Sequence, residues 1–173
     1  IDDDIRWLVA LVSDTGMRLA EAAGLSVSDF NLQGDIPFVE VRPHPWRSLK
    51  TSASARVIPL SGMALWAAQR ILQRANTSSY AFHRYNRGSR TSSNSASAAI
   101  NKWLRNYVPV GCTMHSFRHS MRDRLRAVQC PSDIADQIGG WATDGVGQGY
   151  GSGYPIEVLM GWMGKTVAAN QRQ

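Results

Sequence analysis

The stretch 114–150 constrains the fold of this chain most, because proline and glycine divide it into short elements. Its first part predicts a helix over 115–128, and the Cys-Pro pair that follows ends that helix. A second helix is predicted from residue 131 or 132 to about residue 138, where a Gly-Gly pair stops it. Glycines then surround Tyr150 and predict a mobile segment there.

The rest of the chain is also mainly helical, with one interruption by strands. Apolar spacing predicts further helices over about 5–12, 18–25, 61–74, 97–107 and 155–163. Two β-rich runs, 36–41 and 56–60, are joined by a polar, proline-broken connection, which indicates a hairpin or small sheet. Ser61 is expected to cap the helix that follows it, and 76–97 is expected to be a loop. The predicted fold class is mainly α with a small antiparallel β-sheet (α+β), in a single domain over 1–173.

The composition indicates a basic protein with a real core and an anionic partner. Hydrophobic residues make up 43% of the chain, which is enough for a core. Lys and Arg total 19 against 13 Asp and Glu, so the net charge is +6 and the sequence pI is near 9.8. Nucleic acid is the commonest anionic partner of such a chain.

The cysteines, the apolar runs and the first residues of the chain indicate in which cell compartment the protein is found. Cys112 and Cys130 are too few for a disulfide framework and fit a reducing cytosol. No apolar run is long enough to span a bilayer, and the acidic start is unlike a signal peptide. A cytoplasmic location is therefore expected. Because the chain does not begin with Met, we expect a fragment from which an N-terminal domain is absent.

Three side chains of the first stretch suggest phosphate chemistry. His115 and Arg118 stand three residues apart, so they share one face of the predicted helix. A cation beside a second hydrogen-bonding group suits a phosphate, and a tyrosine is a competent nucleophile toward phosphorus. Arg18 lies at another predicted helix start, where it can join free backbone N–H groups around an anion, with Glu21 one turn on to hold it. Taken alone, that second pair is better explained as a surface ion pair.

The motifs are more specific together than apart. Thr-Gly-x-Arg-x-x-Glu at 15–21 is followed by a lysine in a hairpin, His-x-x-Arg at 115–118, Gly-Gly-Trp at 139–141 and a tyrosine nine residues after the tryptophan. In order and spacing this set resembles the tyrosine recombinases, also called the phage-integrase family, from residue 8 to residue 150. The resemblance implies the catalytic-domain fold of that family and a site-specific recombinase or integrase, which cuts and rejoins DNA.

The resemblance also implies a role for each matching residue. Arg18 and Arg118 correspond to the two arginines that clamp the scissile phosphate. Tyr150 corresponds to the nucleophile that forms a 3′-phosphotyrosyl link and leaves a free 5′-hydroxyl. Lys50 corresponds to the hairpin lysine that protonates the leaving oxygen, and Glu21 corresponds to an acidic residue that buttresses the site.

Two further positions complete the implied site. His115 corresponds to a histidine that hydrogen-bonds the phosphate and assists proton transfer. Trp141 stands where the family has His or Trp, and its indole N–H can donate to the phosphate but cannot act as a base. Neither a metal nor ATP nor another cofactor is implied, because the arginines do the charge work that a metal ion does elsewhere.

Some assignments stay open at the level of sequence. Tyr154, four residues after Tyr150, is the rival nucleophile, although the spacing from Trp141 favours Tyr150. His115 and His119 have the i,i+4 spacing of a helical zinc pair, but no third ligand is evident nearby and no metal site is predicted. His119 is then structural or a contact to the DNA backbone.

Double-stranded DNA is the expected partner. Its candidate contacts, chosen by charge and position, are Arg42, Arg47, Arg56, His119, His44, His83 and Arg84. The arginines expected to form a mostly solvated face are Arg122, Arg124 and Arg126. The resemblance implies a tetramer on DNA, with the apolar helix 155–163 as a candidate for docking on a neighbour, whereas the isolated fragment should be a monomer. Two other functions share these features: a type IB topoisomerase-like enzyme that relaxes DNA, and a DNA-binding module that has lost catalysis.

Overall fold

The computed structural model describes residues 2–51, 54–74, 78–141 and 153–170. Its helices are α1 (Asp4–Thr15), α2 (Leu19–Ala23), α3 (Gly62–Arg74), α4 (Ser93–Leu104), α5 (Met114–Ala127), α6 (Ser132–Gly139) and α7 (Ile156–Asn170), with 3₁₀ turns η1 (Val27–Asp29) and η3 (His83–Tyr85). Its strands are β1 (Phe30–Asn31), β2 (Phe38–Val41), β3 (Arg56–Pro59), β4 (Asn86–Arg87) and β5 (Arg90–Thr91). The predicted fold class, mainly helical with a small antiparallel sheet, is confirmed.

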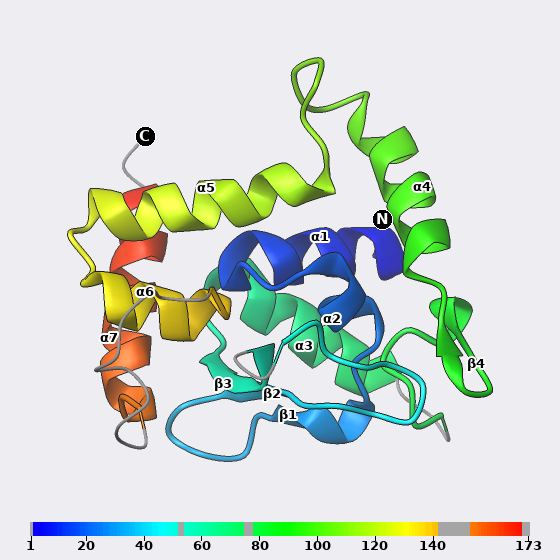
Figure 1. The fold of residues 1–173 in the computed structure, drawn as a ribbon, viewed down its shortest axis with the longest axis horizontal. Helices are drawn as coiled ribbons and strands as arrows, with labels where there is room; N and C mark the ends of the chain where they lie inside the picture. The colour runs from blue at the N-terminus through cyan, green and yellow to red at the C-terminus, as the bar shows by residue number, and fades with distance from the viewer. Residues whose placement is uncertain (1, 52–53, 75–77, 142–152, 171–173) are drawn as a thin grey trace.

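Helix α1 is the centre of the core and packs on α3 and α5, which lie on either side of it in Figure 1. Leu8, Leu11 and Val12 are almost completely buried and recur at the spacing of one helix face. The side chain of Asp3 caps the helix by accepting a hydrogen bond from the backbone N–H of Arg6 at 3.0 Å. With α1 fixed on two sides, the elements that follow it hold defined positions.

The sheet has the strand order β1-β2-β3 and is antiparallel throughout. Val39 pairs with Ile58, and both are fully buried, so one face of the β2–β3 hairpin belongs to the core. The hairpin predicted from the two β-rich runs is therefore confirmed, and 42–55 connects its strands. Strand β1, only two residues long, was not predicted, because so short a run gives no alternating pattern.

The predicted cap of α3 is wrong. The Ser61 hydroxyl is buried without a hydrogen-bond partner in the described part of the chain. The backbone N–H of Met63 instead donates to Asp14 Oδ2 at 2.8 Å, so the cap comes from the end of α1. Gly62 has φ +55°, and a Cβ at that position would lie 2.8 Å from Asp14 Oδ2. The carboxylate thus reaches the first turn of α3 only because residue 62 has no side chain.

The segment 76–97, expected to be a loop, contains regular structure. It includes the β4–β5 hairpin and the first turn of α4, which begins at Ser93 rather than at residue 97. The residues of that first turn are short and polar, which favours a loop in isolation. The helix forms nevertheless because Ala96, Ile100 and Leu104, four residues apart, are buried on one face.

The last helix packs on its own domain. Leu159, Met163 and Thr166 lie on one side of α7 and are buried against the rest of the chain, with β3 and α5 among the neighbours. The helix continues to Asn170, beyond the predicted end at residue 163. Much of the apolar face that was expected to dock on a neighbouring protomer is therefore occupied within the chain. None of the helices in the described ranges is long and apolar enough to cross a bilayer.

Candidate active site

Two arginines from different helices meet at one oxygen. Arg18 is the N-cap residue of α2 and follows a tight corner at Gly16, whose φ of +67° places it in the left-handed region. Arg118 lies on the buried side of α5. Arg18 Nη2 donates to the carbonyl oxygen of Gly140 at 3.4 Å, and Arg118 Nη2 donates to the same oxygen at 3.5 Å. The two guanidinium groups therefore have one shared acceptor, as two clamps on one phosphate oxygen would.

Arg118 is held by several backbone carbonyls at once. Its Nη1 donates to Gly139 at 2.6 Å and also to Gly16. Partial burial, together with the nearby charge of Arg18, lowers the pKa of Arg118 to about 10. The side chain is therefore still charged at neutral pH.

The Gly-Gly-Trp turn forms one wall of this site. Gly140, with φ +61°, ends α6 in the left-handed region, and the Trp141 ring then lies against two arginines. The guanidinium carbons of Arg118 and Arg122 lie 4.6 Å and 5.0 Å from the ring centroid of Trp141. A Cβ on Gly139 would come within 1.9 Å of Trp141 Cζ3, so the ring needs a glycine there. That the indole N–H donates to a phosphate stays a prediction.

The Glu21 carboxylate bonds to two arginines, Arg18 and Arg56. Its Oε1 accepts from Arg18 Nη1 at 2.8 Å, and its Oε2 accepts from Arg56 Nη2 at 3.0 Å and from the backbone N–H of Arg18 at 2.8 Å. Burial alone would raise the pKa of the Glu21 carboxyl, but the charge and hydrogen bonds of Arg56 and Arg18 outweigh it and lower that pKa. The carboxylate is therefore ionised at neutral pH and fixes the direction of Arg18.

His115 lies on the same turn of α5 as Arg118 and borders a pocket of about 290 Å³ beside it. The walls of that pocket come from α1, α2, α4 and α5. Partial desolvation of the ring, then the charges of His119, Arg118 and Arg18, lower the pKa of His115. The neutral imidazole therefore predominates at pH 7 and can accept or pass on a proton.

His115 and His119 contact each other, with ring centroids 4.8 Å apart in an edge-to-face arrangement. Within the described ranges, no group of three His, Cys, Asp or Glu side chains is placed to hold a metal ion. The pair is thus a ring contact on the exposed side of α5, and a DNA-backbone contact by His119 stays a prediction.

Lys50 lies on the connection between β2 and β3 and is exposed. Among the described residues, no hydrogen bond or ion pair is recorded for its ammonium group. The connection nevertheless reaches the site, because the Ser54 hydroxyl accepts a hydrogen bond from Arg18 Nη1 at 3.2 Å. Sequence reasoning missed Ser54, since one serine in a serine-rich connection gives no signal.

Of the two candidate nucleophiles, Tyr150 and Tyr154, the structure describes only Tyr154. Tyr150 lies outside the described residues, so its role as nucleophile stays a prediction. The Tyr154 hydroxyl donates to Asp133, and that bond to a carboxylate raises the pKa of Tyr154. The backbone N–H of Tyr154 also donates to Gln137 Oε1 at 2.8 Å. A nucleophile needs the opposite shift, so these contacts count against the rival.

The basic residues of the β2–β3 connection are less available to DNA than expected. Arg56 was expected to contact DNA, but its side chain is only 4% exposed and donates to the carbonyl of Ile138 at 2.8 Å. Arg47 is also buried, and its Nη2 donates to the carbonyl of Arg42 at 2.8 Å. Both arginines therefore support the fold instead of presenting a charge at the surface. Arg42 is 40% exposed and pairs with Asp29 at 2.8 Å.

The arginines at the end of α5 form only partly the solvated face that was expected. Arg126 is exposed and pairs with Asp123, as a surface residue does. Arg124 is mostly buried, pairs with Asp14 at 3.1 Å and donates to the carbonyl of Ser13. The expectation is wrong for Arg124, because its partner comes from α1, which lies beside α5 in Figure 1.

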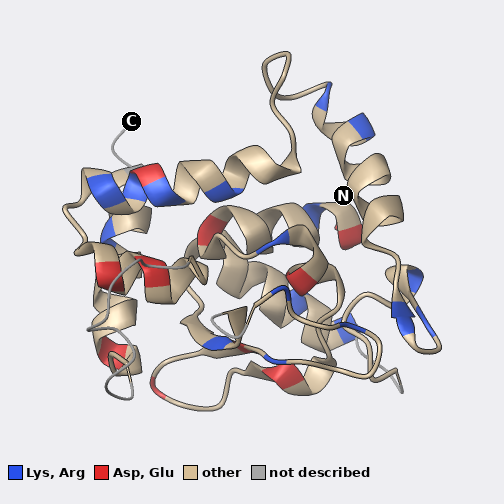
Figure 2. Cartoon of the chain, in the orientation of Figure 1, with Lys and Arg blue, Asp and Glu red and all other residues tan. Residues whose placement is uncertain are grey.

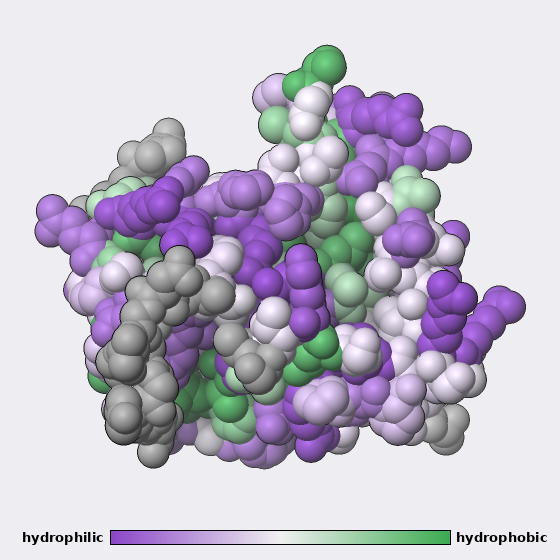
Figure 3. Space-filling view, in the orientation of Figure 1, coloured by the Kyte–Doolittle hydropathy of each residue, from purple (hydrophilic) through white to green (hydrophobic). Residues whose placement is uncertain are grey.

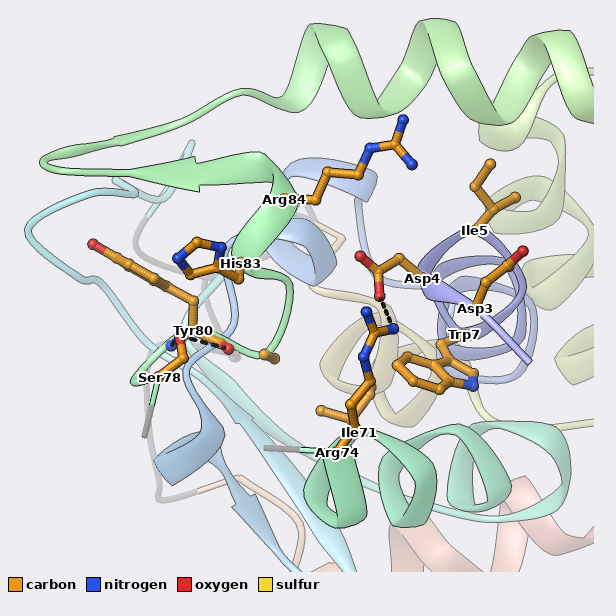
Figure 4. A pocket seen from close by; sticks show the side chains of 11 residues that line it. Asp3, Asp4, Ile5, Trp7, Ile71, Arg74, Ser78, Tyr80, His83 and Arg84 are labelled. Carbon is orange, nitrogen blue, oxygen red and sulfur yellow. Dashed lines mark hydrogen bonds and ion pairs between the residues drawn. The ribbon is translucent and has the colours of Figure 1, made fainter. Parts of the chain in front are cut away.

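A larger pocket, of about 560 Å³, is bordered by the start of α1, the end of α3 and the turn η3 (Figure 4). His83 and Arg84, two of the candidate DNA contacts, line it, and Arg74 donates to Asp4 at 3.0 Å within it. None of the residues predicted for catalysis lines this pocket. The arrangement around Arg18 and Arg118 is therefore the better candidate for phosphate chemistry.

Solved structures of DNA-processing enzymes share this fold. The Tn1549 transposon integrase (residues 82–397) with circular intermediate DNA matches with a TM-score of 0.59 and 16% identity, over 91% of this chain and 56% of that chain. The XerA recombinase matches with 0.55 and 21% identity, over 98% and 58% of the two chains. The XerH site-specific recombinase in a pre-cleavage complex with difH matches with 0.53 and 19% identity, over 80% and 40%.

At these identities the likeness shows the fold, and the chain spans about half the length of the solved structures. A comparison with curated protein sequences gives no match. A family model, described as the phage integrase family, matches residues 3–152, which include all the residues predicted for catalysis. On this match, and with the fold of recombinases around a paired-arginine site, the chain belongs to the phage integrase family.

Proposed function

We propose that this chain is the catalytic domain of a site-specific DNA recombinase that cuts and rejoins DNA through a 3′-phosphotyrosyl intermediate. The observation that carries the proposal is the convergence of Arg18 and Arg118 on the Gly140 oxygen, at 3.4 and 3.5 Å. Two fork-shaped donors aimed at one point can stabilise the charge that develops on the non-bridging oxygens of a phosphate under attack. A surface arginine pair without this function would gain little from such an approach of like charges.

The reaction would proceed by exchange of one phosphate ester for another. The Tyr150 oxygen attacks the scissile phosphorus, the bond from phosphorus to the 5′-oxygen breaks, and Lys50 supplies the proton that the leaving oxygen takes up. In this proposal His115 hydrogen-bonds the phosphate beside Arg118 and takes up the proton of the tyrosine. The reverse steps reseal a strand, because the phosphotyrosine keeps the energy of the original ester.

The charge distribution supports DNA as the partner. No Asp or Glu occurs between Glu40 and Asp123, a stretch that includes the β4–β5 hairpin and α4. The exposed Lys and Arg residues of this stretch that have no carboxylate partner in the described ranges are Lys50, Arg84, Arg87, Arg90, Lys102 and Arg105. Figure 2 shows basic residues on the hairpin and at the end of α4, and Figure 3 shows hydrophilic residues gathered along α5 on the same face. Unpaired, exposed cations are suited to phosphate contacts.

A covalent-trapping assay tests the proposal directly. The protein is incubated with nicked duplexes that carry the attachment region and is then denatured in SDS, and DNA attached to protein is measured. We expect an adduct from the wild type and from Tyr154→Phe, and none from Tyr150→Phe. An adduct lost only in Tyr154→Phe would keep the reaction class and move the nucleophile.

The same preparations distinguish the related functions. Tight DNA binding without any adduct would indicate a DNA-binding module. Relaxation of supercoiled DNA without strand exchange between two duplexes would indicate a type IB topoisomerase-like enzyme. We expect exchange, in a tetramer assembled on two DNA sites, and a monomer in the absence of DNA, which size-exclusion chromatography with light scattering can measure.

A further inference from the structure

We propose that Ser54 is a positioning residue that couples the Arg18 guanidinium to the loop carrying Lys50, so that phosphate binding and proton donation are set by one hydroxyl. The inference rests on the proposed function, because it concerns how two residues of that reaction are placed. Neither the sequence nor the family match assigns a role to this serine.

The Ser54 side chain joins two parts of the site. It is fully buried, and its hydroxyl oxygen accepts a hydrogen bond from Arg18 Nη1 at 3.2 Å. The same hydroxyl lies 3.1 Å from Thr51 Oγ1. Since a guanidinium can only donate, the Ser54 proton is free to be donated to Thr51. The polar chain therefore runs from Arg18 through Ser54 to the residue that follows Lys50.

The Ser54 backbone is fixed independently of that hydroxyl. Its carbonyl accepts from Arg56 Nη1 at 2.6 Å, and its N–H donates to the Thr51 carbonyl at 3.1 Å. Arg56 is in turn paired with Glu21 at 3.0 Å. Removing only the hydroxyl thus leaves the end of the loop anchored by its main chain, and breaks the link between Arg18 and Thr51.

The other end of the loop is tied to the same helix. Trp46 Nε1 donates to the carbonyl of Gly24 at 3.0 Å, and Gly24 is the C-cap residue of α2, whose N-cap residue is Arg18. The Trp46 ring stacks on His44, whose Nε2 lies 2.7 Å from a buried oxygen of Asp29. Lys50 therefore lies between two anchors, one at each end of α2, and the hydroxyl of Ser54 belongs to the anchor nearer the phosphate site.

The chemical consequence concerns the leaving group. An oxygen leaving group needs a proton as the bond to phosphorus breaks, and a displacement of the donor by about 1 Å can cost on the order of 100-fold in rate. A sulfur leaving group needs no such proton, because a thiolate is a much weaker base than an alkoxide and can depart as the anion. A defect that acts through Lys50 should therefore disappear on DNA whose scissile 5′-oxygen is replaced by sulfur, whereas a defect in charge stabilisation by Arg18 should persist.

The experiment measures the rate of covalent adduct formation on both kinds of DNA, with the variants Ser54→Ala, Lys50→Ala and Arg18→Ala. We expect Ser54→Ala to be about 10- to 100-fold slower than wild type on normal DNA and within about 3-fold of it on the sulfur-containing DNA. Lys50→Ala should show the same pattern and Arg18→Ala should be slow on both. Ser61→Ala is the matched control, because its hydroxyl is buried without a partner in the described ranges, and it should match wild type.

Each other result decides against the inference. Ser54→Ala at the wild-type rate on normal DNA overturns it, and so does a Ser54→Ala defect that sulfur does not correct, since the serine would then act through Arg18 alone. If wild type forms no adduct on either DNA, the proposed function itself fails. Should Ser54→Ala not fold, Thr51→Val replaces it, because Thr51 is exposed and this change breaks the far half of the same link. The same correction by sulfur is expected for Thr51→Val, and its absence overturns the inference.

Discussion

Arg56 Nη2 and Glu21 Oε2 form an ion pair 3.0 Å long in which both side chains are only 4% exposed. The pair joins the start of β3 to α2, and through Glu21 it reaches Arg18. Removing one member of a buried pair leaves the other charge without compensation, which costs about 3–5 kcal/mol. Glu21→Gln should lower the free energy of unfolding by about that amount in urea titrations. Asp123→Asn, at an exposed pair, is the control and should stay within about 0.5 kcal/mol of wild type.

The same carboxylate predicts how stability depends on pH. The pKa of Glu21 is lowered in the folded state, so its contribution to stability is complete above its ordinary pKa of 4.5 and is lost as the pH falls through the folded value. The difference in unfolding free energy between wild type and Glu21→Gln should therefore shrink as the pH falls below about 4.5. Urea titrations between pH 7 and acidic pH measure it, and a difference independent of pH would contradict the assignment.

Gly139→Ala should displace the Trp141 ring, because the added Cβ would lie 1.9 Å from Trp141 Cζ3. We expect a loss of about 1–3 kcal/mol in stability, typical of forced overpacking, with slower formation of the covalent adduct. Gly161→Ala in α7 is a matched control, since a Cβ there meets nothing within 4 Å. That variant should gain about 0.5–1 kcal/mol from helix propensity. Thermal unfolding of both proteins gives the comparison.

Arg118→Lys should slow adduct formation by about 100-fold or more, because one ammonium cannot replace a fork that already serves several carbonyls. Its effect on DNA affinity should be much smaller, since the loss falls on the transition state. Arg126→Lys, at a side chain that is 67% exposed, should leave the rate unchanged. Single-turnover trapping and a binding titration separate the two effects, and equal losses in both would argue against a role at the phosphate.

The salt dependence of DNA binding tests the unpaired cations. Arg87→Ala and Arg90→Ala should each reduce the slope of log K against log salt concentration by about 0.9, the value expected for a single phosphate neutralised by one side chain. Arg70 and Arg74 are paired with Asp2 and Asp4, and replacing either with alanine should leave the slope nearly unchanged. Fluorescence anisotropy over a salt series measures the slope for all four variants. If the slopes were the same for the two hairpin variants and the two controls, the β4–β5 hairpin would not contact DNA.

Much of the fold was predictable, because its helices bury regular apolar faces. The hairpin β2–β3 and the order of the helices also followed from short β-rich runs and from proline and glycine. The cap of α3 was not predictable, since Asp14 lies at the end of another helix and reaches it only through the packing of α1 on α3. The first turn of α4 was missed because Ala96 is buried by contacts that a local pattern does not contain.

Some residues of the candidate site were predictable from the sequence, and others were not. Arg18 and Arg118 were identified from motifs, and the structure brings them to one oxygen. Arg56 was predicted to contact DNA, because a basic residue in a polar connection gives no sign that it will be buried and paired with a carboxylate 35 residues earlier in the chain. Ser54 was overlooked for a related reason: its importance comes from what it contacts and not from its type.

The shared acceptor of Arg18 and Arg118 has one more consequence. Two like charges that converge on one carbonyl repel each other, and burial together with the charge of Arg18 lowers the pKa of Arg118. The cost of bringing them together is met when the chain folds, before any phosphate arrives. Under the proposed function, an incoming phosphate would find its donors already oriented, and little reorganisation energy would be left for the chemical step.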